Sequence, residues 1–166
     1  YASKYKLKKA LYELGPTGFP FEKFVAAIYE EENYEVTIGQ VVDGACVSHE
    51  VDVIAKHNTK TLYIECKFHG EEGLKCNVKT PLYINARYKD IITKNDIGVN
   101  EGWVVTNTRF TQDALQYGSC VGLHLLSWNY PDNNGLIGLF EIKLHVLSFS
   151  HVSIITHIMQ ISQVYF

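Results

Sequence analysis

Two alternating segments separated by a short polar turn constrain the fold of this chain more than any other feature. Residues 48–56 (SHEVDVIAK) and 61–68 (TLYIECKF) are rich in β-branched and aromatic side chains and alternate in polarity, a pattern typical of half-buried strands. The polar residues 57–60 leave room only for a tight connection between them. We therefore predict two paired strands that form a hairpin.

The rest of the chain extends this hairpin into an α/β domain. Residues 21–32 have apolar side chains at helical spacing, and residues 34–42 alternate like a further strand. Beyond the hairpin we predict helices at residues 76–92, with Pro81 near an end or a kink, and at 111–117, with Thr111 as the cap. Two more strands are expected at 103–106 and 121–128. The order α-β-β-β-α-β-α-β predicts an α/β sandwich around a mixed sheet.

The size and composition fit one globular domain. The chain has 166 residues, of which 46% are hydrophobic and 20% charged, which is typical of a soluble folded protein. Its net charge of −3 does not exclude nucleic-acid binding, because an acidic protein can keep a local basic face. One stretch contains five basic residues and Asp90 as its only acid, namely Lys75, Lys79, Arg87, Lys89 and Lys94. A solvated helix face explains this stretch equally well.

Three segments are expected along the chain. Residues 1–18 form a basic helix and linker, and because position 1 is tyrosine we interpret them as the remnant of a longer upstream region. Residues 19–130 form the main domain, and residues 131–166 form a C-terminal tail without an assigned role. The tail is apolar but too often interrupted by polar residues for a membrane span, which needs about 20 mostly apolar residues. Its three histidines, His145, His151 and His157, are interpreted as structural or surface residues.

The four cysteines do not indicate a disulfide framework or a zinc site. They are Cys46, Cys66, Cys76 and Cys120, and they include no Cys-x-x-Cys pair. No signal peptide is visible at the start of the sequence. We therefore expect reduced thiols in a cytoplasmic protein.

The first strand of the hairpin carries an acid among apolar residues. Strand side chains alternate between the two faces of a sheet. We therefore expect Val51 and Val53 on one face and Asp52 with Ile54 on the other.

The second strand adds a carboxylate and an ammonium. Glu65 and Lys67 share one face, with the Cys66 side chain on the other, and the short turn is expected to bring Asp52 beside Glu65. Two carboxylates are hard oxygen ligands suited to Mg²⁺, and the Cys66 carbonyl is a third candidate ligand. A metal bound there would polarise a phosphate and lower the pKa of a bound water.

Lys67 completes a set that phosphodiester hydrolysis needs. It could orient or deprotonate the attacking water, or offset charge that develops on the phosphate. Burial and a nearby metal are expected to lower its pKa. On the Glu-x-Lys triplet alone, however, a plain surface salt bridge between Glu65 and Lys67 is the better interpretation, because the triplet is short and common.

Five segments in a fixed order resemble the Mrr-type catalytic domain of the PD-(D/E)XK restriction-endonuclease-like superfamily. They are FEKFVAAIYEEENYEV, HEVDVIA, YIECKFH, VVTNTRFTQDA and GLHLLSW, and they lie between residues 19 and 128. The resemblance implies the restriction-endonuclease-like fold, a three-layer sandwich in which helices flank a central mixed β-sheet. It also makes residues 19–130 the catalytic domain.

The resemblance implies roles for individual residues. Asp52 matches the metal-binding aspartate, Glu65 the second acid and Lys67 the catalytic lysine. Glu22 matches the helix glutamate that many members use as an additional metal or water ligand, although the first turn of a helix favours an acid in any case. Val51 stands where the family motif often has proline.

Further residues are candidates for the same site. Glu50 precedes Asp52 by two residues and could be an extra ligand. Candidate contacts to DNA are His69, Lys75, Lys79, Arg87 and Lys89.

The resemblance implies a metal-dependent endonuclease that hydrolyses DNA phosphodiester bonds with Mg²⁺, for which Mn²⁺ would substitute. One alternative is a module with a nuclease fold that binds DNA or a branched junction without cutting it. A third interpretation is a nucleotide-regulated scaffold whose acids are structural. Cleavage of both strands would favour a homodimer, and close relatives carry a nucleotide-binding ATP-cone domain upstream. No membrane association is expected.

Overall fold

The computed structural model describes residues 8–9, 11–12, 17–95, 99–132 and 134–139. Their helices and strands are α2 (Phe19–Glu30), β1 (Glu35–Asp43), β2 (Ser48–His57), β3 (Lys60–Lys67), β4 (Lys75–Cys76), α3 (Lys79–Lys94), β5 (Val99–Thr106), β6 (Arg109–Phe110), α4 (Gln112–Val121) and β7 (His124–Leu126). This order confirms the predicted succession of elements and adds the two short strands β4 and β6.

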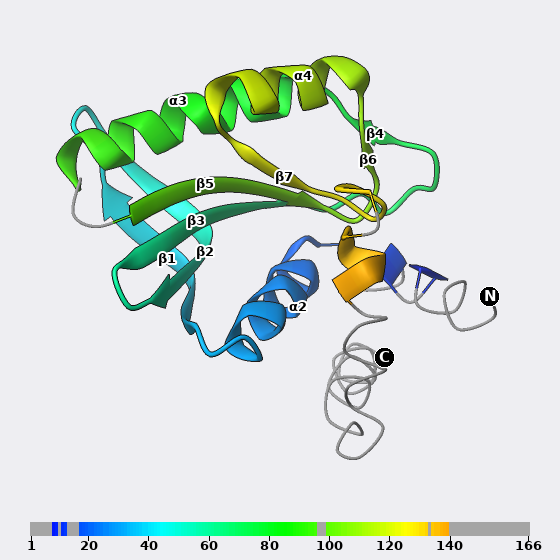
Figure 1. Cartoon of the computed structure of the whole chain (residues 1–166), viewed down its shortest axis with the longest axis horizontal. Coiled ribbons are helices and arrows are strands. Elements are labelled where there is room, and N and C mark those ends of the chain that lie inside the picture. The colour runs from blue at the N-terminus through cyan, green and yellow to red at the C-terminus, as the bar shows by residue number, and fades with distance from the viewer. Residues whose placement is uncertain (1–7, 10, 13–16, 96–98, 133, 140–166) are drawn as a thin grey trace.

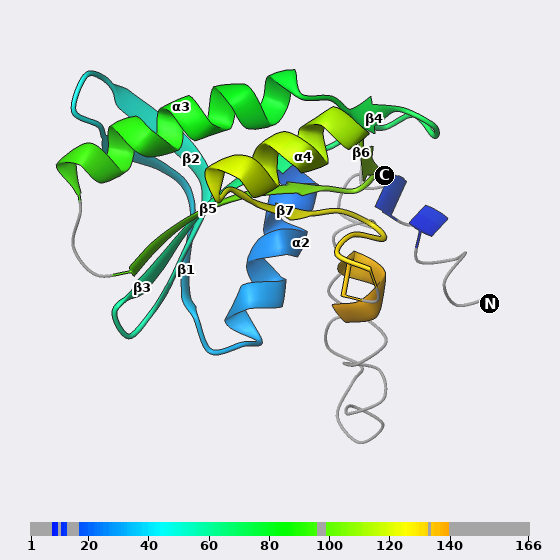
Figure 2. The same ribbon diagram turned by 45° about the horizontal axis from the view of Figure 1, so that its top comes forward.

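A mixed sheet forms the middle layer. Among the described residues, five strands pair in the order β1-β2-β3-β5-β7, and β4 pairs separately with β6. Neighbouring strands are antiparallel from β1 to β3 and parallel from β3 to β7. Helices α3 and α4 lie over one face of the sheet and α2 over the other (Figures 1 and 2). The predicted three-layer α/β sandwich is therefore confirmed.

Apolar side chains fill both interfaces between the layers. On the α2 side, Phe21 and Phe24 pack with Val53 and Ile64 in the largest core cluster. On the opposite side, Ile84 of α3 packs with residues of β5 and α4. Each face of the sheet is thus covered by helices.

Several predicted boundaries were wrong. Strand β5 begins at Val99 rather than at residue 103, and α4 ends at Val121 rather than at residue 117. The helix predicted from residue 76 begins at Lys79, because Lys75 and Cys76 pair with β6; Pro81 then falls in the first turn, where its missing N–H is harmless. The strand predicted from residue 121 begins at His124. Val121 instead ends α4, which Gly122 closes with a left-handed φ of 73°.

The N-cap prediction for the same helix is confirmed. The hydroxyl of Thr111 accepts a hydrogen bond from the backbone N–H of Ala114 at 3.3 Å. Such a contact satisfies one of the free N–H groups at a helix start.

The side-chain alternation predicted for β2 breaks at Asp52. Val53 belongs to the core cluster beneath α2, whereas Val51 packs with Ile54 and Ile91 on the α3 side. Val51 and Val53 therefore do not share a face. The β1–β2 register pairs Ile38 with Val53 and Gln40 with Val51 and leaves out Gly39 and Asp52 between them. Gly39 has a positive φ of 64°, a backbone conformation that favours glycine. The irregularity thus spans both strands at the level of Asp52.

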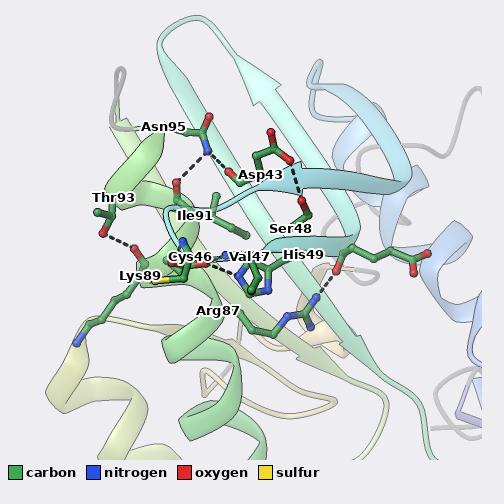
Figure 3. A network of polar contacts seen from close by, with 12 residues as sticks. Asp43, Cys46, Val47, Ser48, His49, Arg87, Lys89, Ile91, Thr93 and Asn95 are labelled. Carbon is green, nitrogen blue, oxygen red and sulfur yellow. Dashed lines mark hydrogen bonds and ion pairs between the residues drawn. The ribbon is translucent and has the colours of Figure 1, made fainter.

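Helix α3 anchors the turn between β1 and β2 (Figure 3). Asp90 of α3 contacts the His49 ring at 2.8 Å and accepts hydrogen bonds from the N–H groups of Cys46 at 2.8 Å and Val47 at 3.2 Å. The bond to His49, with those of the two N–H groups, lowers the pKa of Asp90 to about 2 although partial burial opposes the shift. One carboxylate therefore fixes the end of the hairpin that leads into Asp52.

We expect Asp90→Asn to lower the melting temperature at neutral pH. A carboxyl whose pKa is depressed in the folded state stabilises the fold above its unfolded value of about 3.9. That stability is lost as the pH falls through about 2. The difference in melting temperature between wild type and variant should therefore shrink between about pH 4 and pH 2. A difference independent of pH over this range would contradict the ionic role of Asp90.

The segments that flank the main domain are described only in part. Of the predicted N-terminal helix, Leu11 is buried and joins the main core cluster, as does Leu136 of the predicted C-terminal tail. The tail histidines His145, His151 and His157 lie outside the described residues. No helix within the described ranges is long and apolar enough to cross a membrane. All four cysteines are described, and all are free thiols.

Candidate active site

Asp52 lies where β2 and β3 stop pairing as regular strands. Their register ends at Val53 opposite Ile64. One residue further along, the Asp52 carboxylate accepts a hydrogen bond from the backbone N–H of Cys66 at 2.7 Å. Asp52 therefore lies beside the Glu65–Lys67 segment, as expected. Its side chain, rather than a backbone carbonyl of β2, accepts the hydrogen bond from β3.

Glu65 is buried between two cations. Only 8% of the residue is exposed; one carboxylate oxygen lies 2.9 Å from the Lys67 ammonium and the other 2.9 Å from the Arg87 guanidinium. A buried carboxylate needs such partners, because removing an unpaired charge from water is costly. The pair of Glu65 and Lys67 is therefore more than an exposed salt bridge.

Arg87 ties the two strands together from α3. Besides Glu65, its guanidinium donates a hydrogen bond to the backbone carbonyl of Glu50; Figure 3 shows the Arg87 side chain extending from α3 with a dashed line at its end. Its guanidinium carbon lies 5.3 Å from the centre of the Tyr83 ring, a cation–π distance. Arg87, which the sequence offered as a candidate DNA contact, is therefore paired with Glu65 of the acid cluster. Nothing in the local spacing around residue 87 signals this role.

The acids of the site repel one another. Burial raises the pKa of Asp52 to about 6, with a further contribution from Glu65 and opposition from the Cys66 N–H. Burial also raises the pKa of Glu22, followed by the charges of Glu50 and Glu65. Glu22, which projects from the first turn of α2, therefore feels the same negative field as the hairpin acids. A cluster of this kind attracts cations.

Lys67 is held as an ammonium. Burial works to lower its pKa, but the hydrogen bond to Glu65 and the charges of Glu65 and Asp52 outweigh it and raise the pKa, contrary to the lowering predicted from the sequence. Lys67 is thus a hydrogen-bond donor beside the acids.

The chemical type of the oxygen donors at this site suits a hard divalent cation, but their spacing in this structure does not form a metal site. The hydroxyl of Thr106 in β5 donates to the Lys67 carbonyl at 2.7 Å, so the carbonyl of the preceding Cys66 points to the other side of β3, toward Asp52, as its N–H does. Asp52, Glu65 and this carbonyl offer oxygen ligands of the kind Mg²⁺ prefers. Within the described ranges no three His, Cys, Asp or Glu side chains are grouped closely enough to hold a metal ion. Because both Glu65 oxygens are paired, a metal there would have to displace or share a cation.

The remaining candidates for DNA contact differ in their surroundings. Asn107 of the β5–β6 turn binds both backbone groups of His69, accepting from its N–H at 2.9 Å and donating to its carbonyl at 2.8 Å. Burial, followed by the charge of Lys67, lowers the pKa of the His69 ring. The other candidates are exposed and lie at β4 or on α3, namely Lys75, Lys79 and Lys89.

We expect Asp52→Asn to stabilise the protein at pH 7 in the presence of a chelator. A carboxyl with a raised folded pKa favours folding when protonated, so wild-type stability falls as the pH rises from about 3.9 to about 6. With allowance for solvent screening of this half-buried group, the variant should be roughly 1–2 kcal/mol more stable at pH 7 and equal to wild type near pH 3. Urea denaturation at both pH values measures this difference, and a variant less stable at pH 7 would contradict it.

Comparison with known proteins identifies the family. The family model of the Mrr catalytic domain, described as restriction endonuclease, matches residues 15–129. An uncharacterized protein of Archaeoglobus fulgidus is 35% identical over 119 residues, which cover 72% of this chain and 66% of that protein. The chain thus spans just under two thirds of that relative.

Solved structures share the fold. The crystal structure of AF1548, a protein of unknown function, has a TM-score of 0.68 and 34% identity and is matched over 80% of this chain and 66% of its own. The protein VC1899 from Vibrio cholerae has a TM-score of 0.50 at 19% identity, over 78% of this chain and 33% of its own, and at that identity supports the fold alone. By the family match over more than half of its length, this chain belongs to the restriction endonuclease family.

Proposed function

We propose that this chain is a Mg²⁺-dependent endonuclease that hydrolyses phosphodiester bonds of DNA. The observation that carries the proposal is the convergence of Asp52, Glu65 and Lys67 at the point where β2 and β3 separate. A structural salt bridge between Glu65 and Lys67 would not need Asp52, an acid with a raised pKa, beside it. Metal-assisted hydrolysis uses such a cluster of acids. Membership of a restriction endonuclease family supports the same chemistry.

The chain supplies the ligands and the charges for this reaction. Asp52, Glu65 and the Cys66 carbonyl would hold the metal, with Glu22 as a further ligand or as a partner of a bound water. When bound, the metal lowers the pKa of a coordinated water and polarises the phosphate. Lys67, as a donor next to Glu65, orients the attacking water or offsets the charge that develops on the phosphate oxygens.

Arg87 acts through Glu65 in this proposal. It fixes one carboxylate oxygen and, through the Glu50 carbonyl, the neighbouring strand. These contacts orient the Glu65 carboxylate, which a bound metal would share with Arg87.

Nicking of supercoiled plasmid during a Mg²⁺ titration tests the proposal. We expect wild type to nick with Mg²⁺ or Mn²⁺ and not with EDTA, and Asp52→Asn to be inactive while remaining folded. Linear product would additionally support a homodimer, because one site per chain cuts one strand at a time. DNA binding without any nicking would favour the alternative of a non-cleaving DNA-binding or junction-binding module.

A further inference from the structure

Strands β4 and β6 bring two basic side chains together beside the active site. In this parallel pair, Lys75 stands directly next to Arg109, and both residues are exposed. Within the described residues neither forms an ion pair. Like charges at neighbouring strand positions destabilise a sheet. An anion bound between Lys75 and Arg109 would offset this repulsion in the short β4–β6 pair.

These two side chains line a cavity. Its volume is about 450 Å³, within the range of sites that bind small ligands. The lining also includes Lys8, Tyr12, Asn107 and Trp128. The acid in the lining, Glu72, is paired with Lys8 at 3.2 Å, so Lys75 and Arg109 leave the cavity with excess positive charge.

The cavity is joined to the active-site strand. Asn107 lines the cavity and holds both backbone groups of His69, two residues beyond Lys67. Thr106, which precedes Asn107, holds the Lys67 carbonyl. Cavity and active site therefore share the edge formed by the carboxyl ends of β3 and β5, where ligands of α/β sheets commonly bind.

We propose that this cavity is a phosphate-binding subsite for the DNA strand, at a phosphate neighbouring the one that is cut. The inference rests on the proposed function, and it places the DNA over β4 and β6 rather than along α3. Arg and Lys recognise phosphate by charge-assisted hydrogen bonds, and such contacts fix the register of the nucleic acid without reading its sequence. On α3, Arg87 is occupied with Glu65, which leaves exposed residues such as Lys89 outside this subsite.

Binding of a fluorescent duplex in EDTA, measured at several salt concentrations, tests the subsite without cleavage. The double variant Lys75→Gln/Arg109→Gln should bind at least roughly tenfold more weakly, and the slope of log affinity against log salt should fall by roughly 2, since each phosphate contact contributes about 0.9. The control Lys56→Gln removes one exposed charge at the far end of β2 and should leave affinity and slope unchanged. Lys75→Arg/Arg109→Lys keeps both charges and should retain most of the affinity.

Other outcomes separate this inference from the proposed function. Equal affinity and slope for wild type and the double variant, or no DNA binding by wild type, would overturn the subsite. If ATP raises the melting temperature of wild type but not of the double variant, and duplex affinity is unaffected, the cavity takes phosphates of a free nucleotide and the DNA assignment is overturned. Salt-dependent DNA binding that needs Lys75 and Arg109, without nicking by wild type, would support the subsite while contradicting the nuclease.

Discussion

Under the proposed function, replacing Lys67 by alanine should lower the rate of Mg²⁺-dependent DNA cleavage by about 10²–10⁴-fold and leave metal binding nearly intact, as expected for a group that acts in the transition state. The ammonium donates to Glu65 at 2.9 Å, and it lies beside the acids without being a metal ligand itself. Its removal therefore deletes charge stabilisation or water orientation rather than the metal site. Plasmid nicking and calorimetric titration with Mn²⁺, on the same preparations, measure the two effects separately.

Lys60 provides a matched control on the same strand. It pairs with Glu101 at 2.8 Å, and its side chain is 37% exposed against 38% for Lys67. Lys60→Ala thus removes a comparable ion pair, worth about 0–1 kcal/mol, at the opposite end of β3. Only the Lys67 variant should lose cleavage. Equal nicking by wild type and Lys67→Ala, or equal loss in both lysine variants, would contradict the assignment of Lys67.

The hairpin could be predicted because its determinants are local. A short turn and alternating side chains set the register of β2 and β3, and this register places Asp52 next to the Glu65–Lys67 segment. The break in alternation at Asp52 was missed. A signal for it exists in Gly39, since an isolated glycine inside a strand pattern often marks an irregularity.

Contacts between distant segments could not be predicted in the same way. The pairing of Lys75 with Arg109 depends on strands of two residues, which are too short to show a period of two. The role of Arg87 depends on how α3 is rotated against the sheet, and the sequence around it shows only a basic helix face. The resemblance to a family indicated the acids and the lysine but not this arginine. The ion pair between Arg87 and Glu65 was therefore found only in the structure.

Replacing Arg87 by glutamine should destabilise the protein by about 3 kcal/mol, toward the lower end for breaking a buried ion pair. The Arg87 and Glu65 side chains are only 16% and 10% exposed. Without the guanidinium, one Glu65 oxygen and the Glu50 carbonyl lose their donor. Lys67 remains on the other oxygen and limits the loss. Urea denaturation at pH 7 measures the change, with Lys89→Gln as an exposed control expected within about 0.5 kcal/mol of wild type.

A double-mutant cycle with Glu65→Gln shows whether the destabilisation of Arg87→Gln comes from the Glu65 carboxylate that has lost its arginine partner. If it does, the double variant Glu65→Gln/Arg87→Gln should be more stable than Arg87→Gln alone, because removing both partners leaves no buried charge without its counterion. Strictly additive effects would instead attribute the loss to the contacts of Arg87 with Glu50 and Tyr83. A change no larger than that of Lys89→Gln would show that Arg87 is exposed in solution, and would return it to the set of candidate DNA contacts on α3.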